Sequence, residues 1–198
     1  LGPNGSGKST LMRIIAGLIK SWDGNIYFKG KPIVEDSIYL HRVGFLIENP
    51  AFYEHLTAAE NLIMLSRLTN SPLDNIDRLL EKVDLYGSAN KVVKKFSYGM
   101  KQRLGIAQAI LNNPDILFLD EPSNGLDPNG IVQMNKTIIE LNKQGKTICL
   151  STHVVEHVKD LCSHIVILKE GNLILNDTIE NLFKNTTKYD IKSNDIES

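Results

Sequence analysis

The residue types with the clearest chemistry stand at the start of the chain, in the pattern G-x-x-x-x-G-K-[ST] between Gly2 and Ser9. Its glycines permit backbone conformations in which successive N–H groups curl around an anion. Lys8 adds a catalytic point charge for the β- and γ-phosphates, and the Ser9 hydroxyl is placed to bind Mg²⁺. Apolar residues then recur at helical spacing, so the loop leads into a helix whose N-terminal dipole favours anions. The pattern predicts a nucleoside triphosphate site formed by Asn4, Gly5, Ser6, Gly7, Lys8, Ser9 and Thr10.

Two adjacent carboxylates, Asp120 and Glu121, follow a short apolar run at 116–119. At the end of a strand beside a phosphate-binding loop, the first carboxylate is expected to hold Mg²⁺. The second is expected to polarise an attacking water or take its proton. His153 follows another apolar run, and the carboxyl ends of parallel strands face the ligand crevice. We therefore predict that His153 reaches the γ-phosphate and that Glu121 is the general base.

Apolar periodicity predicts the elements that position these residues. Strands are expected at 25–28, 43–47, 116–119, 147–150 and 165–168, with a turn at 29–32. Helices are expected after the loop, from residue 57 onward, and at about 72–83, 100–111, 131–141 and 154–161. The second of these starts at a capping box made by Thr57 and Glu60. Fully apolar strands that alternate with helices predict an α/β fold with a parallel sheet covered on both faces.

The order of these elements predicts two parts. A nucleotide-binding core is expected at 1–48 and 113–198, interrupted by a helical subdomain at 49–112. A phosphate-binding loop follows a buried strand, and only Leu1 precedes Gly2. We therefore expect N-terminal strands to be missing from this chain.

Composition narrows the function classes. The chain has 198 residues, 42% of them hydrophobic, which suits one domain or a domain with a subdomain. The net charge is −1 and the pI is near 6.6. The chain therefore lacks the excess of basic residues that is typical of nucleic-acid-binding proteins. No apolar run approaches the length of a membrane span. Cys149 and Cys162 are expected to be buried free thiols in a reducing compartment.

The segment Phe96-Ser97-Tyr98-Gly99-Met100-Lys101-Gln102-Arg103, here the signature segment, follows the helical stretch and precedes the strand with Asp120 and Glu121. This combination resembles the ATP-binding subunits of ABC transporters. Residues 123–127 look like the D-loop of that family, and His153 like its switch histidine. The resemblance implies a P-loop NTPase core with an inserted signature subdomain. It also implies that two copies pair head to tail, so that Ser97, Gly99 and Asp127 contact the ATP held by the partner's phosphate-binding loop.

This sequence departs from the common family pattern at two places. The signature segment carries Tyr98 and Met100 at the third and fifth positions of the common form L-S-G-G-Q. Arg103, farther along this segment, is expected to support the fold rather than contact ATP. Glu48 stands where the family usually places a glutamine that meets Mg²⁺ and the attacking water, at the hinge before the helical subdomain. Glutamate remains an oxygen ligand, and its added charge should favour a bound metal. This glutamate and the following Asn-Pro-Ala-Phe-Tyr resemble the ATP-binding subunits of bacitracin-type and lantibiotic self-protection exporters.

The resemblance implies a function. We expect an ATP-hydrolysing subunit of a bacterial exporter of antimicrobial peptides, cytoplasmic and peripheral on the inner face of the cell membrane. A second copy and a membrane-spanning permease that contacts residues 49–55 are the expected partners, with ATP and Mg²⁺ as cofactors and no nucleic acid. The alternative is a soluble ABC-type ATPase that is not coupled to transport. The short span between Lys8 and Ser97 shows no extended heptads, which argues against the chromosome-maintenance type.

Overall fold

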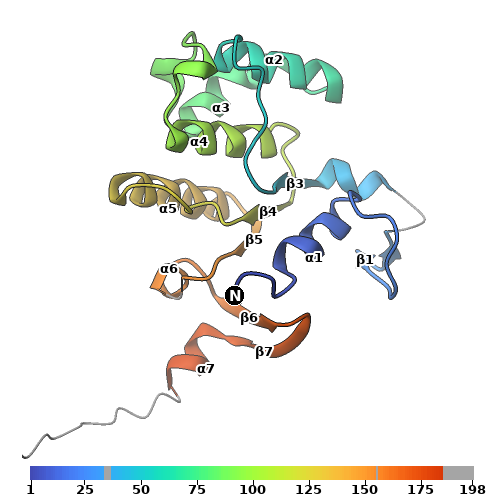
Figure 1. Cartoon of the computed structure of the whole chain (residues 1–198). Helices are drawn as coiled ribbons and strands as arrows, with labels where there is room; N and C mark the ends of the chain where they lie inside the picture. Colours follow the sequence, from blue (N-terminus) through green and yellow to red (C-terminus); the bar gives the residue numbers. More distant parts are fainter. Residues whose placement is uncertain (34–36, 155, 185–198) are drawn as a thin grey trace, which may run out of the picture.

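A three-stranded parallel sheet forms the centre of the molecule (Figure 1). The computed structural model describes residues 1–33, 37–154 and 156–184. Strand β4 (Ile116–Asp120) lies between β3 (Val43–Leu46) and β5 (Thr147–Ser151), and both pairings are parallel. Leu117 and Leu119, alternate residues on one face of β4, are fully buried in the core that the sheet shares with the helices. The predicted α/β fold with a parallel sheet is confirmed.

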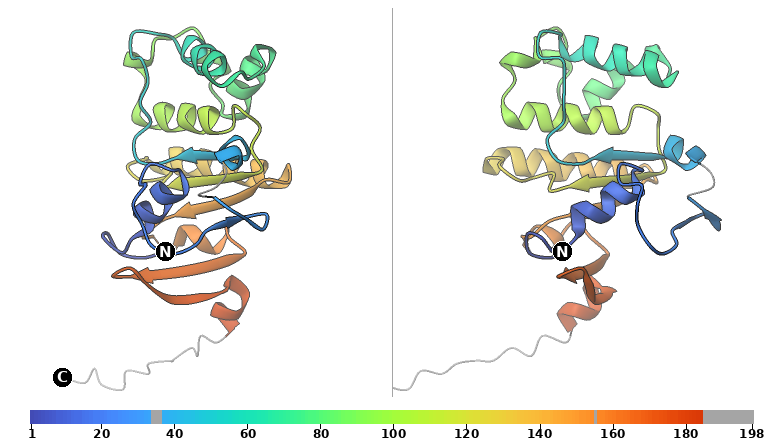
Figure 2. Two further views of the ribbon diagram at one scale, coloured as in Figure 1. Left: turned by 90° about the vertical axis from the view of Figure 1, so that its right-hand side faces the viewer. Right: turned by 45° about the vertical axis from the view of Figure 1, so that its right-hand side comes forward.

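Helices cover both faces of this sheet. Helix α1 (Lys8–Ile15) lies on one face and α5 (Pro128–Lys143) on the other, as Figures 1 and 2 show. Pro at the first position of α5 suits a helix start, since the missing N–H has no partner there in any helix. The helix predicted at 154–161 is shorter, as α6 (Glu156–Lys159), and residue 155 lies outside the described residues.

An antiparallel hairpin of β6 (His164–Lys169) and β7 (Asn172–Thr178) lies at one end of the molecule, followed by α7 (Ile179–Lys184) (Figure 2). Strand β7 was not predicted. Its turn residues Glu170 and Gly171 both have positive φ, the conformation that two-residue hairpin turns need. Residues 185–198 of the predicted core lie outside the described residues.

The opposite end of the molecule is helical and lies wholly within residues 49–112 (Figure 1). It contains the helices α2 (Ala58–Thr69), α3 (Ile76–Lys82) and α4 (Tyr98–Ala109) and the 3₁₀ turns η2 (Leu73–Asn75), η3 (Tyr86–Ser88) and η4 (Val93–Lys95). The predicted capping box at α2 is present. Thr57 Oγ1 accepts from Glu60 N, and the Glu60 carboxylate accepts from Thr57 N.

The helical end shares its hydrophobic core with the sheet. The two parts approach closely at Gly44 of β3, where a Cβ atom would lie 2.0 Å from the carbonyl oxygen of Ala109. Only glycine lets the strand pass the end of α4 at this distance, since real Cβ atoms do not approach a carbonyl so closely. Gly44 therefore sets how α4 sits on the sheet.

A small antiparallel ladder, β1 (Tyr27–Phe28) with β2 (Lys31–Pro32), precedes the 3₁₀ helix η1 (Ser37–Arg42). The predicted turn at 29–32 was too long. Lys29 and Gly30, with φ of +50° and +80°, make the turn, and the next two residues belong to the strand.

The prediction of a buried Cys149 is wrong. Both cysteines are free, Cys162 is partly buried, and Cys149 is exposed. It lines a cavity of about 790 Å³ bordered by residues of both β5 and β6. Leu1 lies against β6, with its backbone nitrogen donating to Val166 O at 2.6 Å and its carbonyl accepting from Leu168 N at 2.9 Å. In the described part of the chain, no helix has the length and apolar character needed to cross a bilayer.

Candidate functional site

The phosphate-binding loop curls directly into α1. Gly5 and Gly7 have φ of +79° and +103°, which side chains disfavour, and Gly7 is the N-cap of the helix. At Gly2, a Cβ atom would lie 2.3 Å from the carbonyl oxygen of Leu168, so no larger residue fits. The glycines of the motif are therefore needed for the shape of the loop.

The polar groups within this loop fit an anion. Lys8 Nζ donates to the carbonyl oxygens of Gly2 and Pro3, at 2.7 and 3.1 Å, which holds the ammonium inside the loop. Ser6 Oγ is buried and, within the described residues, has no hydrogen-bond partner. Ser9 and Thr10 lie in the first turn of α1, where the helix dipole favours negative charge. Asn4 is exposed at the turn of the loop. The unpartnered Ser6 hydroxyl and the Lys8 ammonium of the same loop suit a bound phosphate chain.

Asp120 lies at the carboxyl end of β4 and is 6% exposed. Its Oδ1 accepts a hydrogen bond from Ser151 Oγ, the residue opposite it in the register of β4 and β5. The Asp120 carboxylate and the Ser9 hydroxyl are oxygen donors of the kind that Mg²⁺ prefers. No cluster of three or more His, Cys, Asp or Glu side chains suited to a metal occurs among the residues that the structure describes. A Mg²⁺ site needs only one or two protein ligands, because the ion keeps waters and substrate phosphates in its coordination shell.

Glu121 and His153 contact each other at the same sheet edge. Glu121 Oε1 lies 3.0 Å from His153 Nδ1, and both side chains line a cavity of about 200 Å³ with residues 122–126. Glu121 has a left-handed backbone, with φ of +47°, and its N–H donates to Ser151 Oγ at 3.1 Å. The histidine can thus orient the carboxylate that was predicted to act as the base.

Glu48 is paired with a side chain of α1. Its carboxylate forms an ion pair with the guanidinium of Arg13 on α1. Glu48 follows β3 and has a positive φ of +60°. Its predicted contact with Mg²⁺ stays a prediction.

The other predicted nucleotide contacts begin helices. Ser97 is the N-cap of α4, with its Oγ accepting from Met100 N at 3.3 Å. Asp127 is the N-cap of α5 and accepts from Gly130 N at 3.0 Å. In Figures 1 and 2, α4 and the phosphate-binding loop lie on opposite sides of β3 and β4. Ser97 and Gly99 are thus remote from the loop of their own chain.

Arg103 supports the fold, as predicted. Its Nη1 donates to the carbonyl oxygen of Asp84 at 3.0 Å and to the Asp84 carboxylate at 2.8 Å, and its side chain is 14% exposed.

Sequence reasoning missed two members of the site. Ser151 bonds both Asp120 and the backbone of Glu121, and Arg13 holds Glu48. The signal for Ser151 was its place at the end of the strand before His153. Nothing local in the sequence pairs Arg13 with Glu48.

Comparisons with known proteins agree with this geometry. Residues 1–124 match the family described as ABC transporter. The bacitracin transport ATP-binding protein BcrA of Bacillus licheniformis is 43% identical over 197 residues, which cover 96% of this chain and 63% of that protein. The lantibiotic transport ATP-binding protein SrtF of Streptococcus pyogenes is 38% identical over 196 residues, which cover 96% of this chain and 85% of SrtF. The chain thus spans just under two thirds of the length of BcrA.

Solved structures share the fold. An ATP-binding subunit of an ABC transporter superposes with a TM-score of 0.80 at 30% identity, over 93% of this chain and 79% of that one. The subunit cbiO1 of Clostridium perfringens, part of the transporter complex cbiONQ, gives 0.82 at 30% identity, over 93% and 78%. The phosphate-binding loop, the paired carboxylates and the signature segment all lie within residues 1–124, the part that matches the family. The chain belongs to the ABC transporter family.

Proposed function

We propose that this chain is the ATP-binding and ATP-hydrolysing subunit of a bacterial ABC transporter that exports an antimicrobial peptide. The observation that carries the hydrolytic role is the contact between Glu121 and His153, next to the buried Asp120. The names of BcrA and SrtF, bacitracin and lantibiotic transport ATP-binding proteins, support the class of cargo.

The residues divide the work of phosphoryl transfer. The loop N–H groups and Lys8 bind the phosphates, which is positioning and charge stabilisation rather than covalent chemistry. Glu121 takes a proton from the attacking water, and His153 holds its carboxylate in place. When bound, Mg²⁺ would be held by Ser9 and Asp120, with Glu48 meeting it, and would supply positive charge at the β- and γ-phosphates. Ser151 keeps Asp120 oriented from the neighbouring strand.

Two partners complete the proposal. Because Ser97 and Gly99 are remote from their own loop, a second copy in head-to-tail orientation would present them, with Asp127, to the bound ATP. A separate membrane-spanning subunit would contact residues 49–55, where Tyr53 is 54% exposed and stacks edge-on with His55. With these partners, the chain would act on the cytoplasmic face of the cell membrane.

To test the enzymatic role, ATP hydrolysis by the full-length wild-type protein is compared with ATP hydrolysis by the Glu121→Gln variant. We expect turnover to fall by about 10²- to 10⁴-fold, the range for removing a general base, while ATP binding is kept. Unchanged turnover would rule out Glu121 as the base. Loss of bacitracin or lantibiotic resistance in cells that carry Glu121→Gln would support export, whereas unchanged resistance would favour a soluble ATPase not coupled to transport.

A further inference from the structure

We propose that Tyr98 is a positioning residue that ties the start of the signature helix α4 to the hinge (residues 47–50) and to the loop 123–127, so that these three segments move as one. The consequence for hydrolysis rests on the proposed function, but the mechanical link itself does not. The common form of the signature has glycine at this position, which offers no side chain for such a link.

The phenol is held by hydrogen bonds on both sides. Tyr98 OH donates to Asn49 Oδ1 at 3.0 Å and accepts from Gln102 Nε2 at 2.8 Å. Gln102 lies one turn along α4 and is 3% exposed, so it is a fixed donor. Asn49 belongs to the hinge and is exposed. A residue of the signature helix thus bonds the hinge directly.

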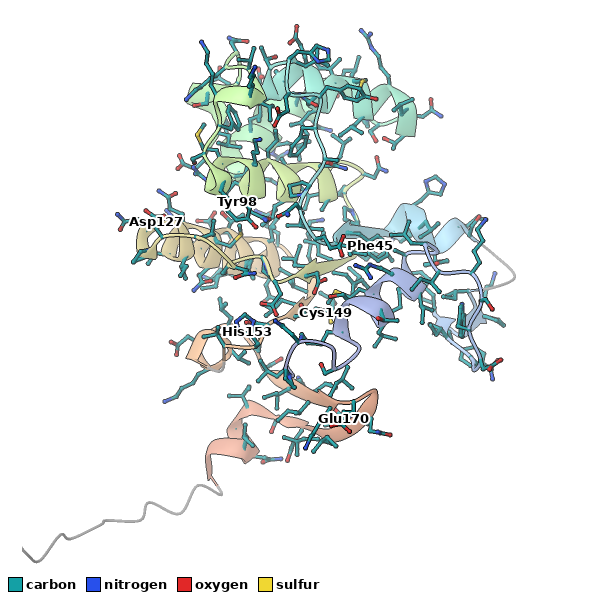
Figure 3. The ribbon with its side chains drawn as sticks, in the orientation of Figure 1. Phe45, Tyr98, Asp127, Cys149, His153 and Glu170 are labelled. Carbon is teal, nitrogen blue, oxygen red and sulfur yellow. The ribbon has the colours of Figure 1, made fainter. Side chains whose placement is uncertain are left out.

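The ring makes the second connection. At Gly125, which has φ of +73°, a Cβ atom would lie 3.2 Å from Cε1 of Tyr98, so the ring lies against the backbone of this loop. At Gly99, a Cβ atom would lie 3.3 Å from Cδ2 of Leu126. The loop 123–127 therefore packs onto the first turn of α4, and Figure 3 shows Tyr98 between α4 and α5.

Each connected segment leads to a different part of the site. Asn49 follows Glu48, which is bound to Arg13 on the helix after the phosphate-binding loop. Neighbouring hinge residues are thus attached to opposite parts of the chain, one to α1 and the next to α4. The loop 123–127 lines the same cavity as Glu121 at its start and ends at Asp127, the N-cap of α5. Any displacement of α4 is transmitted through Tyr98 to both.

Hydrogen exchange of the full-length, nucleotide-free protein tests the link without any need for hydrolysis. Tyr98→Phe keeps the ring over Gly125 and removes both hydrogen bonds. We expect amides at 47–49 to exchange about fivefold faster, the effect of losing a hydrogen bond of ~1 kcal/mol, whereas amides at 123–126, which keep their contact with the ring, should exchange as in the wild type. Tyr86→Phe, at an exposed tyrosine on η3, is the matched control and should exchange as the wild type does. Wild-type exchange at 47–49 in Tyr98→Phe would overturn the proposal.

Two further measurements separate positioning from general stability. Asn49→Ala should reproduce the hinge effect of Tyr98→Phe, and the double variant should add nothing, because both remove the same bond. Full additivity would overturn the direct link. In steady-state hydrolysis, we expect Tyr98→Phe to lower kcat about fivefold with the KM for ATP within twofold, since the phosphate-binding loop is untouched. A change confined to KM would contradict a role in coupling α4 to Glu121. Inactive wild-type protein would instead refute the proposed function and leave the exchange result standing.

Discussion

Arg13 and Glu48 form an ion pair that joins the helix after the phosphate-binding loop to the hinge. The pair neutralises the carboxylate that replaces the glutamine usual in this family. It also coincides with a strained backbone, because φ of +60° at a residue with a Cβ atom costs on the order of 1 kcal/mol. Under the proposed function, Mg²⁺ would have to compete with this guanidinium for the oxygen atoms of Glu48.

Removal of Arg13 should make the metal bind more readily. In Arg13→Gln, we expect the Mg²⁺ concentration for half-maximal hydrolysis to fall about two- to fivefold, because an exposed ion pair contributes ~1 kcal/mol or less. Glu48→Gln should raise that concentration, since it removes the charge that attracts the metal. The measurement is ATPase activity in a Mg²⁺ titration.

The matched control for this prediction is Arg67→Gln, which removes an exposed arginine near the end of α2. It should leave the titration unchanged. In the Glu48→Gln background, Arg13→Gln should have no further effect on the titration. A titration of Arg13→Gln that superposes on the wild type would show that the pair does not oppose metal binding.

Loss of His153 should lower catalysis without weakening ATP binding. His153→Ala removes the group 3.0 Å from the Glu121 carboxylate, and we expect kcat to fall by about 10²-fold, the lower end of the range for general base catalysis. Steady-state kinetics and ATP binding of the same preparation measure the two effects. His164→Ala, which removes a histidine whose ring contacts Ser163, serves as the control.

The two residues should also act as a unit. His153→Ala in a Glu121→Gln background should cost little more, because residues that work together are not additive. A further 10²-fold loss in the double variant would mean that His153 acts independently of Glu121.

Features built from neighbouring residues were predictable from the sequence. The glycine-rich loop, the capping box of Thr57 and Glu60, and the apolar strand that ends at Asp120 each depend on short spacings. The parallel sheet followed from apolar strands that alternate with helices. Each of these features depends on interactions between residues close in sequence, so a local pattern is enough to predict it.

Features that depend on register or distant packing were not predictable. Ser151 contacts Asp120 because β4 and β5 pair in one register. Asn49 and Tyr98 are hydrogen-bonded although most of the helical segment lies between them in the sequence. The exposure of Cys149 depends on a cavity between β5 and β6 rather than on its apolar neighbours. Such contacts depend on which elements become neighbours in space, and no local pattern reports that.

Gly44 should be sensitive to substitution although it is not part of the phosphate-binding loop. Gly44→Ala places a Cβ atom 2.0 Å from the Ala109 carbonyl oxygen, and we expect it to lower the free energy of unfolding by about 1–3 kcal/mol, as overpacking does. Urea denaturation of the full-length protein measures this. Gly87→Ala is the matched control, because its Cβ atom would meet nothing within 4 Å. Equal stability of the two variants would mean that β3 and α4 can separate freely at this point.

Low pH should weaken the ion pairs that Asp115, the residue before β4, forms with Arg42 and Lys29. The Asp115 carboxylate accepts from Arg42 Nη2 at 2.6 Å and from Lys29 Nζ at 3.2 Å, and these bonds hold the pKa of Asp115 below its ordinary value. The nearby Lys146 ammonium donates instead to the carbonyl oxygen of Pro114 and to Asn113. A carboxyl with a lowered folded pKa stabilises the fold above its unfolded pKa, and this stabilisation is lost as the pH falls through the folded value.

The difference in unfolding free energy between the wild type and Asp115→Asn should therefore be largest at neutral pH and shrink toward pH 3, because the protonated carboxyl resembles the amide. Urea denaturation at several pH values measures it, and Asp23→Asn, at an exposed position, controls for the loss of one negative charge. Added salt at neutral pH should also shrink the difference, since these charges are partly exposed and screened. A difference that stays constant from pH 7 to pH 3 would show that Asp115 acts through packing rather than through its charge.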